Sequence, residues 1–325
     1  IGNSGFTYYS GALDDFRVFK RELNTQEVSA MYREYTQSRI YTLNVPARIT
    51  TGTLDLYNIY NDFSGAYAMR RLFEEYADAH VRIERSSDTT QADLYFDKDG
   101  NLTSIENSVE TNLTTWLNGS IAEVVKWYDQ SGNTNHVEPN SNSPELIVGT
   151  VAPFIGRYGI YFGTAEDREL YLANFGNFRT TADQPHTIFA GYRGISFTSA
   201  QNLFAIGTPA TNQTIAFHPN NGNYYFYSND MLYGQLDIGT VAFRYSGGGG
   251  TSANKKLYLD GVVQNGTGGS TSSLNLATNP PLRIGHYSSR GSGFRFDGNV
   301  FHILFANSDL GENLIQNIST SMNAS

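Results

Sequence analysis

VVKWYDQSGNTNHVEPN (residues 124–140) begins with valines and aromatic residues and then becomes abruptly polar. Valine, tryptophan and tyrosine favour a β-strand, which we expect to end near Tyr128. Asp129 and Ser131 favour a tight turn, because their side chains accept hydrogen bonds from nearby backbone N–H groups. The segment therefore predicts a strand that ends in an ordered corner. Asp129 and His136 also permit a second interpretation, a general acid/base pair.

Short strands between turns also dominate the rest of the chain. HTIFAGYR (186–193) and NVFHILF (299–305) are typical segments, and 32 glycines are available for turns. Many short strands at this spacing indicate an antiparallel β-sandwich. A helix is predicted over residues 65–76, because apolar residues recur there at helical spacing on one face. Those residues are Ala66, Met69, Leu72, Phe73 and Tyr76.

Both ends of the chain carry a similar strand, turn and short helix. GALDDFRVFKREL (11–23) and DGNVFHILFANSDL (297–310) align without gaps over their glycine and apolar positions. We interpret residues 1–36 as the closing strand and helix of a preceding module, residues 37–62 as a connector and residues 63–325 as the main sandwich. A lone strand and helix bury too little surface to fold alone. We therefore expect residues 1–36 to pack on the main domain or to join two copies of the chain.

Charge and composition argue against several classes of function. The net charge of −9 disfavours nucleic-acid binding, which needs clustered Lys and Arg to meet phosphates. The sequence contains no run of about 18 apolar residues, the length that a membrane span requires. The chain has no Cys, so disulfides and thiolate metal sites are excluded.

Two sequence patterns resemble known families. GALDDFRVFKREL and LYLDGVVQNG (257–266) resemble the closing strand and inner hairpin of laminin G-like modules. Residues 54–148, including the corner from Trp127 to His136, resemble the start of the catalytic domain of arabinofuranosidase B-type enzymes. The resemblance implies a concanavalin A-like (jelly-roll) antiparallel β-sandwich with one or two short helices. The same block also occurs in viral and phage surface proteins.

The resemblance also implies where catalytic groups would lie. The family's nucleophilic Glu falls on Ala216 and its acid/base Asp on His286, whereas a retaining glycosidase needs a carboxylate at both positions. Arabinofuranosidase activity by that mechanism is therefore not expected. Another polysaccharide hydrolase or a lyase stays an alternative, with His286, Tyr287, Arg290 and Asp129 as the candidate catalytic residues.

The segment NYYFYSNDMLYG (223–234) is the main candidate for ligand binding. In a strand, Tyr224 and Phe226 would face the core, and Tyr225 and Tyr227 would face outward. Aromatic rings beside polar groups suit a sugar, which stacks on the rings and forms hydrogen bonds through its hydroxyls. With the loop 286–295, the candidate ligand-binding residues are Tyr225, Tyr227, Asn229, Asp230, Tyr233, His286, Tyr287 and Arg295.

Calcium is the one cofactor for which the sequence offers candidate ligands. DKDGN (97–101) places Asp97 and Asp99 in a loop, but its glycine spacing does not fit an EF-hand, and a hairpin turn is the alternative. Asp14 and Asp15 are further candidates, implied by the laminin G-like resemblance.

Three functions follow from these patterns. The first is a glycan-binding or adhesion module of a larger surface or virion protein that binds host or cell-wall polysaccharide. The second is a polysaccharide-degrading enzyme, and the third is a structural or oligomerisation module. For each we expect an extracellular, cell-surface or virion-surface location.

Overall fold

The computed structural model describes the chain from Asp62 to Asn323 apart from five short stretches. The described ranges are 62–163, 167–178, 183–197, 201–227, 230–287 and 294–323. The predictions for residues 1–36, and for the connector before Asp62, lie outside them.

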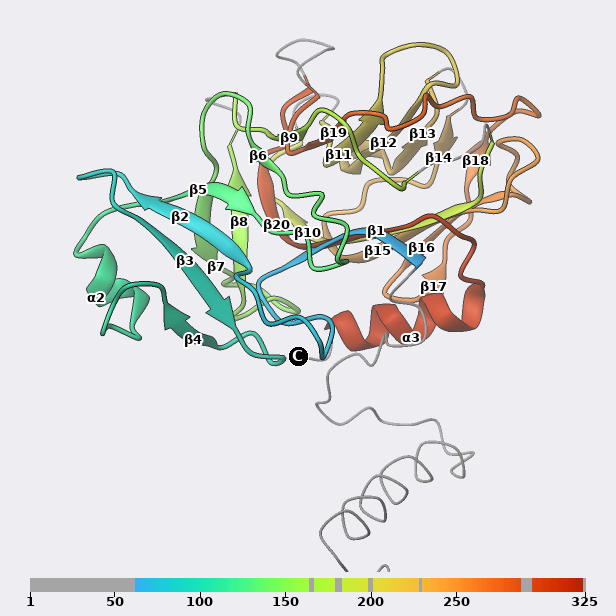
Figure 1. Cartoon of the computed structure of the whole chain (residues 1–325). Helices are drawn as coiled ribbons and strands as arrows, with labels where there is room; N and C mark the ends of the chain where they lie inside the picture. The colour runs from blue at the N-terminus through green and yellow to red at the C-terminus, as the bar shows by residue number, and fades with distance from the viewer. Residues whose placement is uncertain are drawn as a thin grey trace, which may run out of the picture. The chain divides into compact units, whose positions relative to one another are not determined.

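The described residues form two antiparallel β-sheets packed face to face (Figure 1). The larger sheet has twelve strands: β1 (Phe63–Ala68), β2 (Val81–Arg85), β3 (Gln91–Phe96), β4 (Leu102–Ile105), β5 (Ala122–Trp127), β7 (Glu145–Val148), β8 (Tyr158–Phe162), β10 (His186–Gly194), β15 (Ile238–Tyr245), β16 (Lys255–Leu259), β17 (Val262–Val263) and β20 (Gly298–Ala306). The smaller sheet has eight: β6 (Glu138–Pro139), β9 (Leu170–Leu172), β11 (Phe204–Gly207), β12 (Thr214–His218), β13 (Asn223–Tyr225), β14 (Met231–Leu232), β18 (Thr267–Gly268) and β19 (Leu282–Ile284). The predicted antiparallel β-sandwich is confirmed.

The described helices are short. They are α2 (Leu113–Leu117), the 3₁₀ turn η2 (Pro219–Asn221) and α3 (Glu312–Asn323). In the part of the chain that the structure describes, no helix has the length and apolarity to cross a membrane.

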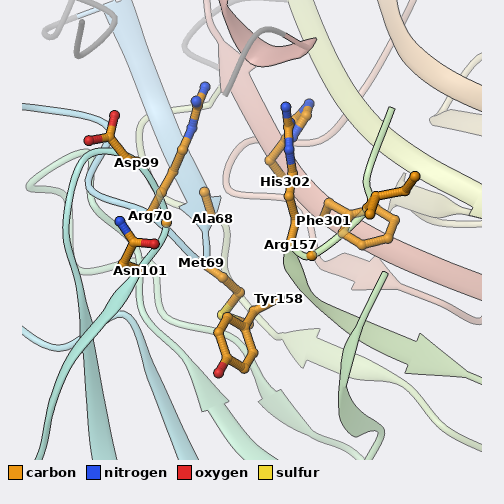
Figure 2. Close-up of a pocket in the computed structure, with 12 residues that line it drawn as sticks. Ala68, Met69, Arg70, Asp99, Asn101, Arg157, Tyr158, Phe301 and His302 are labelled. Atoms are coloured by element: carbon orange, nitrogen blue, oxygen red, sulfur yellow. The ribbon is translucent and has the colours of Figure 1, made fainter. Parts of the chain in front are cut away.

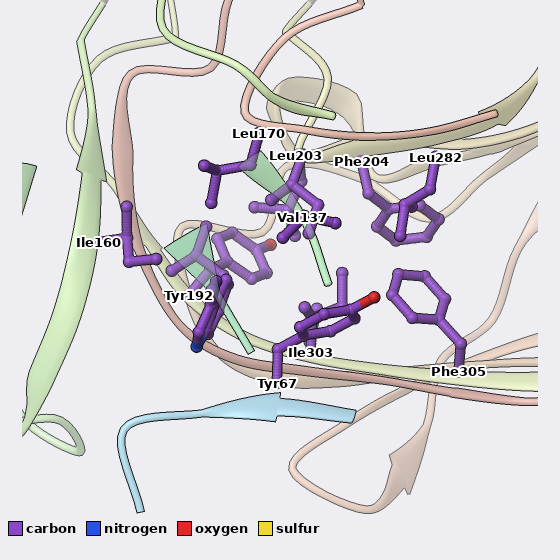
Figure 3. Packing of buried hydrophobic residues seen from close by; sticks show 14 of the residues in the cluster. Tyr67, Val137, Ile160, Leu170, Tyr192, Leu203, Phe204, Leu282, Ile303 and Phe305 are labelled. Carbon is purple, nitrogen blue, oxygen red and sulfur yellow. The ribbon is translucent and has the colours of Figure 1, made fainter. Parts of the chain in front are cut away.

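The main core lies between the two sheets. Figure 3 shows Tyr67, Ile303 and Phe305 of the larger sheet facing Phe204 and Leu282 of the smaller one. All five side chains are fully buried. Burial of one large apolar side chain contributes about 2 kcal/mol, so this aromatic-rich layer supplies most of the attraction between the sheets.

The helix predicted over residues 65–76 is wrong, because residues 63–68 form strand β1. This strand pairs with β20, with Ala66 opposite Leu304 and Tyr67 opposite Ile303. Tyr67 enters the main core, whereas Ala66 and Ala68 enter a second cluster that includes residues of α3. Because both faces of β1 are buried, the strand lacks the polar alternation that would have distinguished it from a helix.

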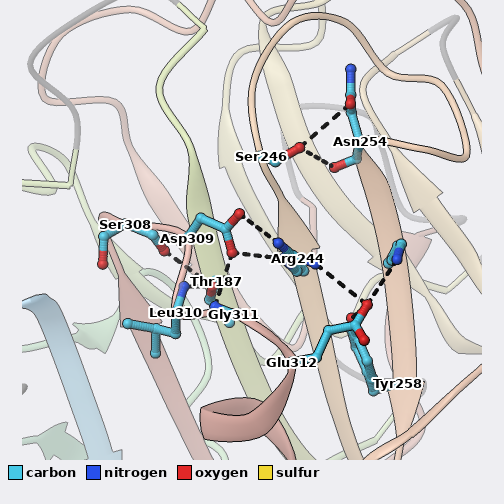
Figure 4. Close-up of polar contacts among 11 residues, drawn as sticks. Thr187, Arg244, Ser246, Asn254, Tyr258, Ser308, Asp309, Leu310, Gly311 and Glu312 are labelled. Carbon is cyan, nitrogen blue, oxygen red and sulfur yellow. Dashed lines mark hydrogen bonds and ion pairs between the residues drawn. The ribbon is translucent and has the colours of Figure 1, made fainter.

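Helix α3 covers the outer face of the larger sheet, where Ile315, Ile318 and Met322 are buried. The short helix predicted after the closing strand is thus confirmed. Its N-terminal end is fixed by charge (Figure 4): Arg244 donates to both oxygens of Asp309, at 2.6 and 2.8 Å, and Glu312 accepts from Lys256 at 2.8 Å.

Arg157 and Arg70 hold the C-terminal end of α3, and Arg70 donates to Met322 Sδ at 2.8 Å. Arg157 donates to the carbonyls of Met322 and Asn323 at 2.6 and 2.7 Å, where cations complement the helix dipole. Figure 2 shows Arg70, Arg157 and His302 extending in the same direction from a pocket of about 160 Å³. Burial and the adjacent Arg157 lower the pKa of Arg70 to about 10. We interpret the residues that line this pocket as structural support for α3.

Candidate functional site

The corner predicted after Tyr128 is built around the buried carboxylate of Asp129. One of its oxygens accepts from the backbone N–H groups of Ala66 and Ser131, both at 2.8 Å. The other accepts from the Ser131 hydroxyl at 2.8 Å and from Asn135 N–H at 3.0 Å. Burial raises the pKa of the Asp129 carboxyl, although each of these hydrogen bonds favours its charged form. The bond from Ala66 ties the corner to β1, and the other three order the corner itself.

The side-chain amides of Gln130 and Asn135 add further hydrogen bonds between the corner and the chain around β1. Gln130 accepts from Leu72 N–H at 2.9 Å and donates to the Ala68 and Arg70 carbonyls at 3.1 and 2.9 Å. Asn135 donates to the Ser64 carbonyl at 2.6 Å. The corner therefore positions the chain on both sides of the end of β1.

His136 occupies the outer side of the corner. Its Nδ1 accepts a hydrogen bond from Asp129 N–H at 3.1 Å, so the ring proton resides on Nε2 in the neutral state. Burial lowers the pKa of His136 and keeps the ring neutral near pH 7. The ring packs edge-on against Tyr128, with 5.0 Å between centroids. His136 thus offers an N–H donor, not a cation.

A groove of about 440 Å³ opens beside this corner; we call it the corner groove. It collects residues from the segment after β1, from β3 and from the corner. Its lining residues are Glu75, Tyr76, Ala77, Asp78, Ala79, Asp93, Tyr95, Tyr128, Asp129, Gly132, Thr134 and His136.

Some polar groups of the corner groove are occupied and others are available. Asp93 accepts from Arg82 Nε and Nη2 at 2.9 and 2.6 Å, and from the Tyr128 hydroxyl at 2.9 Å. Within the described ranges, the Tyr95 hydroxyl has no hydrogen-bond partner, and the exposed carboxylates of Glu75 and Asp78 make no ion pair. The groove therefore presents an aromatic hydroxyl and two carboxylates that a ligand can contact.

The sheet position at which the resemblance places a nucleophile is apolar and closed. Ala216 on β12 pairs with Ala205 on β11, and both are buried in a small cluster with Tyr287. Tyr227 and Phe294 pack over this cluster. The Tyr287 hydroxyl lies 3.1 Å from the Thr214 hydroxyl and is enclosed. Among the described residues of this cluster there is no carboxylate, and the Ala216 side chain is fully buried.

The predicted ligand-binding residues are only partly brought together. His286 pairs with Arg295 in a β-bridge, and its Nδ1 lies 3.7 Å from Asp167, the carboxylate that Arg295 contacts at 2.6 Å. Tyr233 is held elsewhere, with its hydroxyl donating to the Lys255 carbonyl at 2.8 Å.

The segment 223–234 also contributes residues to the core. Tyr224 and Phe226 are fully buried, which confirms the predicted core face of the segment. Asp230 is bound through its carbonyl, which accepts from Gly269 N–H at 2.8 Å. Asn229, Arg290 and the side chain of Tyr225 lie outside the described residues.

The calcium candidates that can be described are engaged in a turn. Asp97 accepts from the N–H groups of Asp99 and Asn101, both at 2.9 Å, as in a hairpin loop. Asp99 pairs with Lys98 at 2.8 Å. Across the described ranges, no group of three His, Asp or Glu side chains is placed to hold a metal ion. Asp14 and Asp15 lie outside these ranges.

Restoring a carboxylate at position 216 is expected to destabilise the fold. The Ala216→Glu side chain would be charged and enclosed by Ala205 and Tyr287, neither of which carries a positive charge, and such burial costs about 3 kcal/mol or more. Thermal unfolding of this variant should show a clearly lower midpoint, whereas Ala253→Glu, at an exposed alanine, should match the parent. An unchanged midpoint for Ala216→Glu would show that this face is open.

The sequence prediction missed most of the corner groove. Helical spacing assigns Tyr76 to the apolar face of a helix, and no sequence pattern distinguishes Asp78 or Tyr95. The alternation along β3 gave a signal, because Tyr95 lies between buried Leu94 and Phe96 and therefore points away from the core.

Comparison with known proteins shows similarity in structure alone. No protein-family model and no curated protein sequence matches the chain. An arabinofuranosidase solved with arabinofuranosyl-α-1,2-xylobiose is similar over 84% of this chain and 64% of its own, with a TM-score of 0.58 and 15% identity. A GH54 α-L-arabinofuranosidase soaked with a cyclic sulfate inhibitor is similar over 84% and 65%, with a TM-score of 0.56 and 14% identity.

The chain spans less than two thirds of either enzyme. At such identities the similarity concerns the fold. It confirms the predicted concanavalin A-like sandwich, and it agrees with the resemblance from which the Ala216 and His286 positions were assigned.

Proposed function

We propose that the chain is a carbohydrate-binding module that recognises its ligand in the corner groove and does not cleave it. The observation that carries this proposal is the groove itself, which places three tyrosines and accessible carboxylates around about 440 Å³. That volume is within the usual range for a small-molecule site and suits one or two sugar rings.

The chemistry of the corner groove suits a sugar. Tyrosine rings stack on the C–H faces of pyranose or furanose rings, and carboxylates accept hydrogen bonds from sugar hydroxyls. The Tyr95 hydroxyl and the Asp78 carboxylate are available for such contacts. Because the corner is tied to β1 by the bonds of Asp129 and Gln130, His136 and Tyr128 are held in place before a ligand arrives.

Two features disfavour the enzyme alternative. A retaining hydrolase of the arabinofuranosidase B type needs a carboxylate at the Ala216 position, which is a buried alanine beneath Tyr227 and Phe294. A lyase that used Tyr287 as its base would need that hydroxyl at the surface, but it is enclosed beside Thr214. The resemblance of residues 54–148 to a block that also occurs in viral and phage surface proteins supports the wider proposal of a surface or virion location.

The Tyr95→Ala variant tests the binding site. We expect a panel of neutral and charged oligosaccharides to contain at least one ligand of the parent chain. Loss of the Tyr95 ring should weaken its binding by about tenfold, the effect of losing roughly 1.4 kcal/mol of stacking. Isothermal titration calorimetry measures the change.

Tyr171→Ala is the matched control, because Tyr171 is a partly buried tyrosine on the outer face of the smaller sheet. It should bind like the parent. If Tyr171→Ala loses binding while Tyr95→Ala retains it, the ligand occupies the smaller sheet and the proposed site is wrong. If no oligosaccharide binds the parent, the proposed function is wrong.

A further inference from the structure

The corner groove carries an excess of negative charge among its lining residues. Glu75 and Asp78 are exposed on it, whereas no Lys or Arg lines it. Of the two other carboxylates in the lining, Asp93 is paired with Arg82, and Asp129 is buried and accepts four hydrogen bonds from Ala66 and the corner. A ligand therefore meets two carboxylates without a matching cation in the groove.

The two cations that lie over the Tyr128 ring are already paired with carboxylates. Arg82 and Lys126 lie over the Tyr128 ring, at 6.0 and 5.7 Å from its centroid. Arg82 is paired with Asp93 at 2.6 Å, and Lys126 with Glu138 at 2.7 Å. His136 adds no charge near pH 7, because burial keeps it neutral. None of these groups is arranged to receive an anionic sugar.

The charge of Asp78 affects the pKa of two tyrosines that line the groove. Burial raises the pKa of the Tyr76 and Tyr95 hydroxyls, and the Asp78 carboxylate raises both further. The two tyrosine rings also present electron-rich faces, which attract a cation held above them. The tyrosine rings and the carboxylates therefore both favour a cationic ligand group.

We propose that the corner groove selects glycans that carry a protonated amino group, such as oligomers of a 2-amino-2-deoxy sugar. This inference rests on the proposed function and adds its ligand class. An ammonium group donates three hydrogen bonds and can approach Asp78 or Glu75 while a sugar ring stacks on Tyr95. An N-acetylated sugar lacks the charge, and a uronate or sulfated sugar is repelled.

The test compares three oligosaccharides of equal length: a glucosamine oligomer, its N-acetylated form and an oligogalacturonate. Calorimetry with the full chain at low salt and about pH 6 should show the glucosamine oligomer binding about fivefold more tightly than the N-acetylated form, as expected for exposed charge pairs. The oligogalacturonate should bind most weakly. The Glu75→Gln/Asp78→Asn double variant should lose the preference for the amine.

The control variant is Glu110→Gln, which removes an exposed carboxylate that does not line the groove and should keep the preference. Equal affinity for the amine and its N-acetylated form, with both weakened by Tyr95→Ala, would overturn the inference about charge and leave the binding function standing. Failure of all three oligosaccharides and of the wider panel to bind would overturn both.

Discussion

The Asp129→Ala variant is expected to lose about 4 kcal/mol of unfolding free energy. The substitution removes the acceptor of three backbone N–H groups, those of Ala66, Ser131 and Asn135, and of the Ser131 hydroxyl. Asp129 is 2% exposed, so water cannot readily replace it, and each buried donor left unpaired costs about 1–3 kcal/mol. Urea unfolding followed by tryptophan fluorescence measures the loss.

Two controls distinguish this role from a general effect of removing charge. Asp129→Asn retains one acceptor oxygen and should lose roughly half as much stability. Asp237→Ala removes an exposed aspartate and should change the unfolding free energy by less than about 0.5 kcal/mol. A loss below about 1 kcal/mol for Asp129→Ala would contradict the structural role assigned to the corner.

Acid is expected to destabilise the chain steeply as the pH falls from about 6.5 to about 4. Burial lowers the pKa of His80 and of His186 from 6.5 to about 4, and burial also lowers the pKa of His302. Above pH 6.5 these histidines are neutral in both states. Between pH 6.5 and 4 the unfolded chain binds protons that the folded chain does not, so folding stability decreases as the pH falls.

His186 shows why protonation is unfavourable. Its Nε2 lies 2.5 Å from the Tyr224 hydroxyl, and its Nδ1 lies 3.3 Å from the Gln184 carbonyl, so the neutral ring already satisfies both neighbours. Lowering the pKa of one histidine from 6.5 to about 4 corresponds to ~3 kcal/mol once the pH is below 4. Raised carboxyl pKa values at Asp129 and Asp297 oppose this trend in part.

Urea unfolding at pH 7, 5.5 and 4.5 tests this prediction. The parent should lose several kcal/mol across the series, and His186→Gln, which cannot be protonated there, should lose less. A flat profile for the parent would contradict the assignment of buried neutral histidines. If His186→Gln does not fold, NMR titration of the histidine ring protons in the parent provides the same test.

The sandwich was predictable from sequence because most strands have one buried face and a polar or turn-rich boundary. Strand β1 was not, since Tyr67 faces one core and Ala66 and Ala68 face another. No local sequence pattern indicates that a second apolar layer, here supplied by α3, also packs against β1.

The candidate site likewise has one part that the sequence predicts and one part that it does not. The corner was predictable because Asp129 and Ser131 form a local turn whose chemistry is contained in adjacent residues. The corner groove was not, because Tyr76, Tyr95 and Tyr128 come from separate segments that only the folded sheet brings together. The closed face at Ala216 depends on the pairing of β12 with β11 and on the packing of Tyr287, which are likewise long-range contacts.

Hydrogen–deuterium exchange of the full chain, with and without its best-bound oligosaccharide, tests the central claim most directly. A ligand in the corner groove should slow exchange at backbone amides of residues 74–79 and 130–136. Amides around Ala216 and Tyr287 should be unaffected. Protection confined to residues 214–218 and 284–287, with none at the corner, would contradict the account and place the ligand on the smaller sheet.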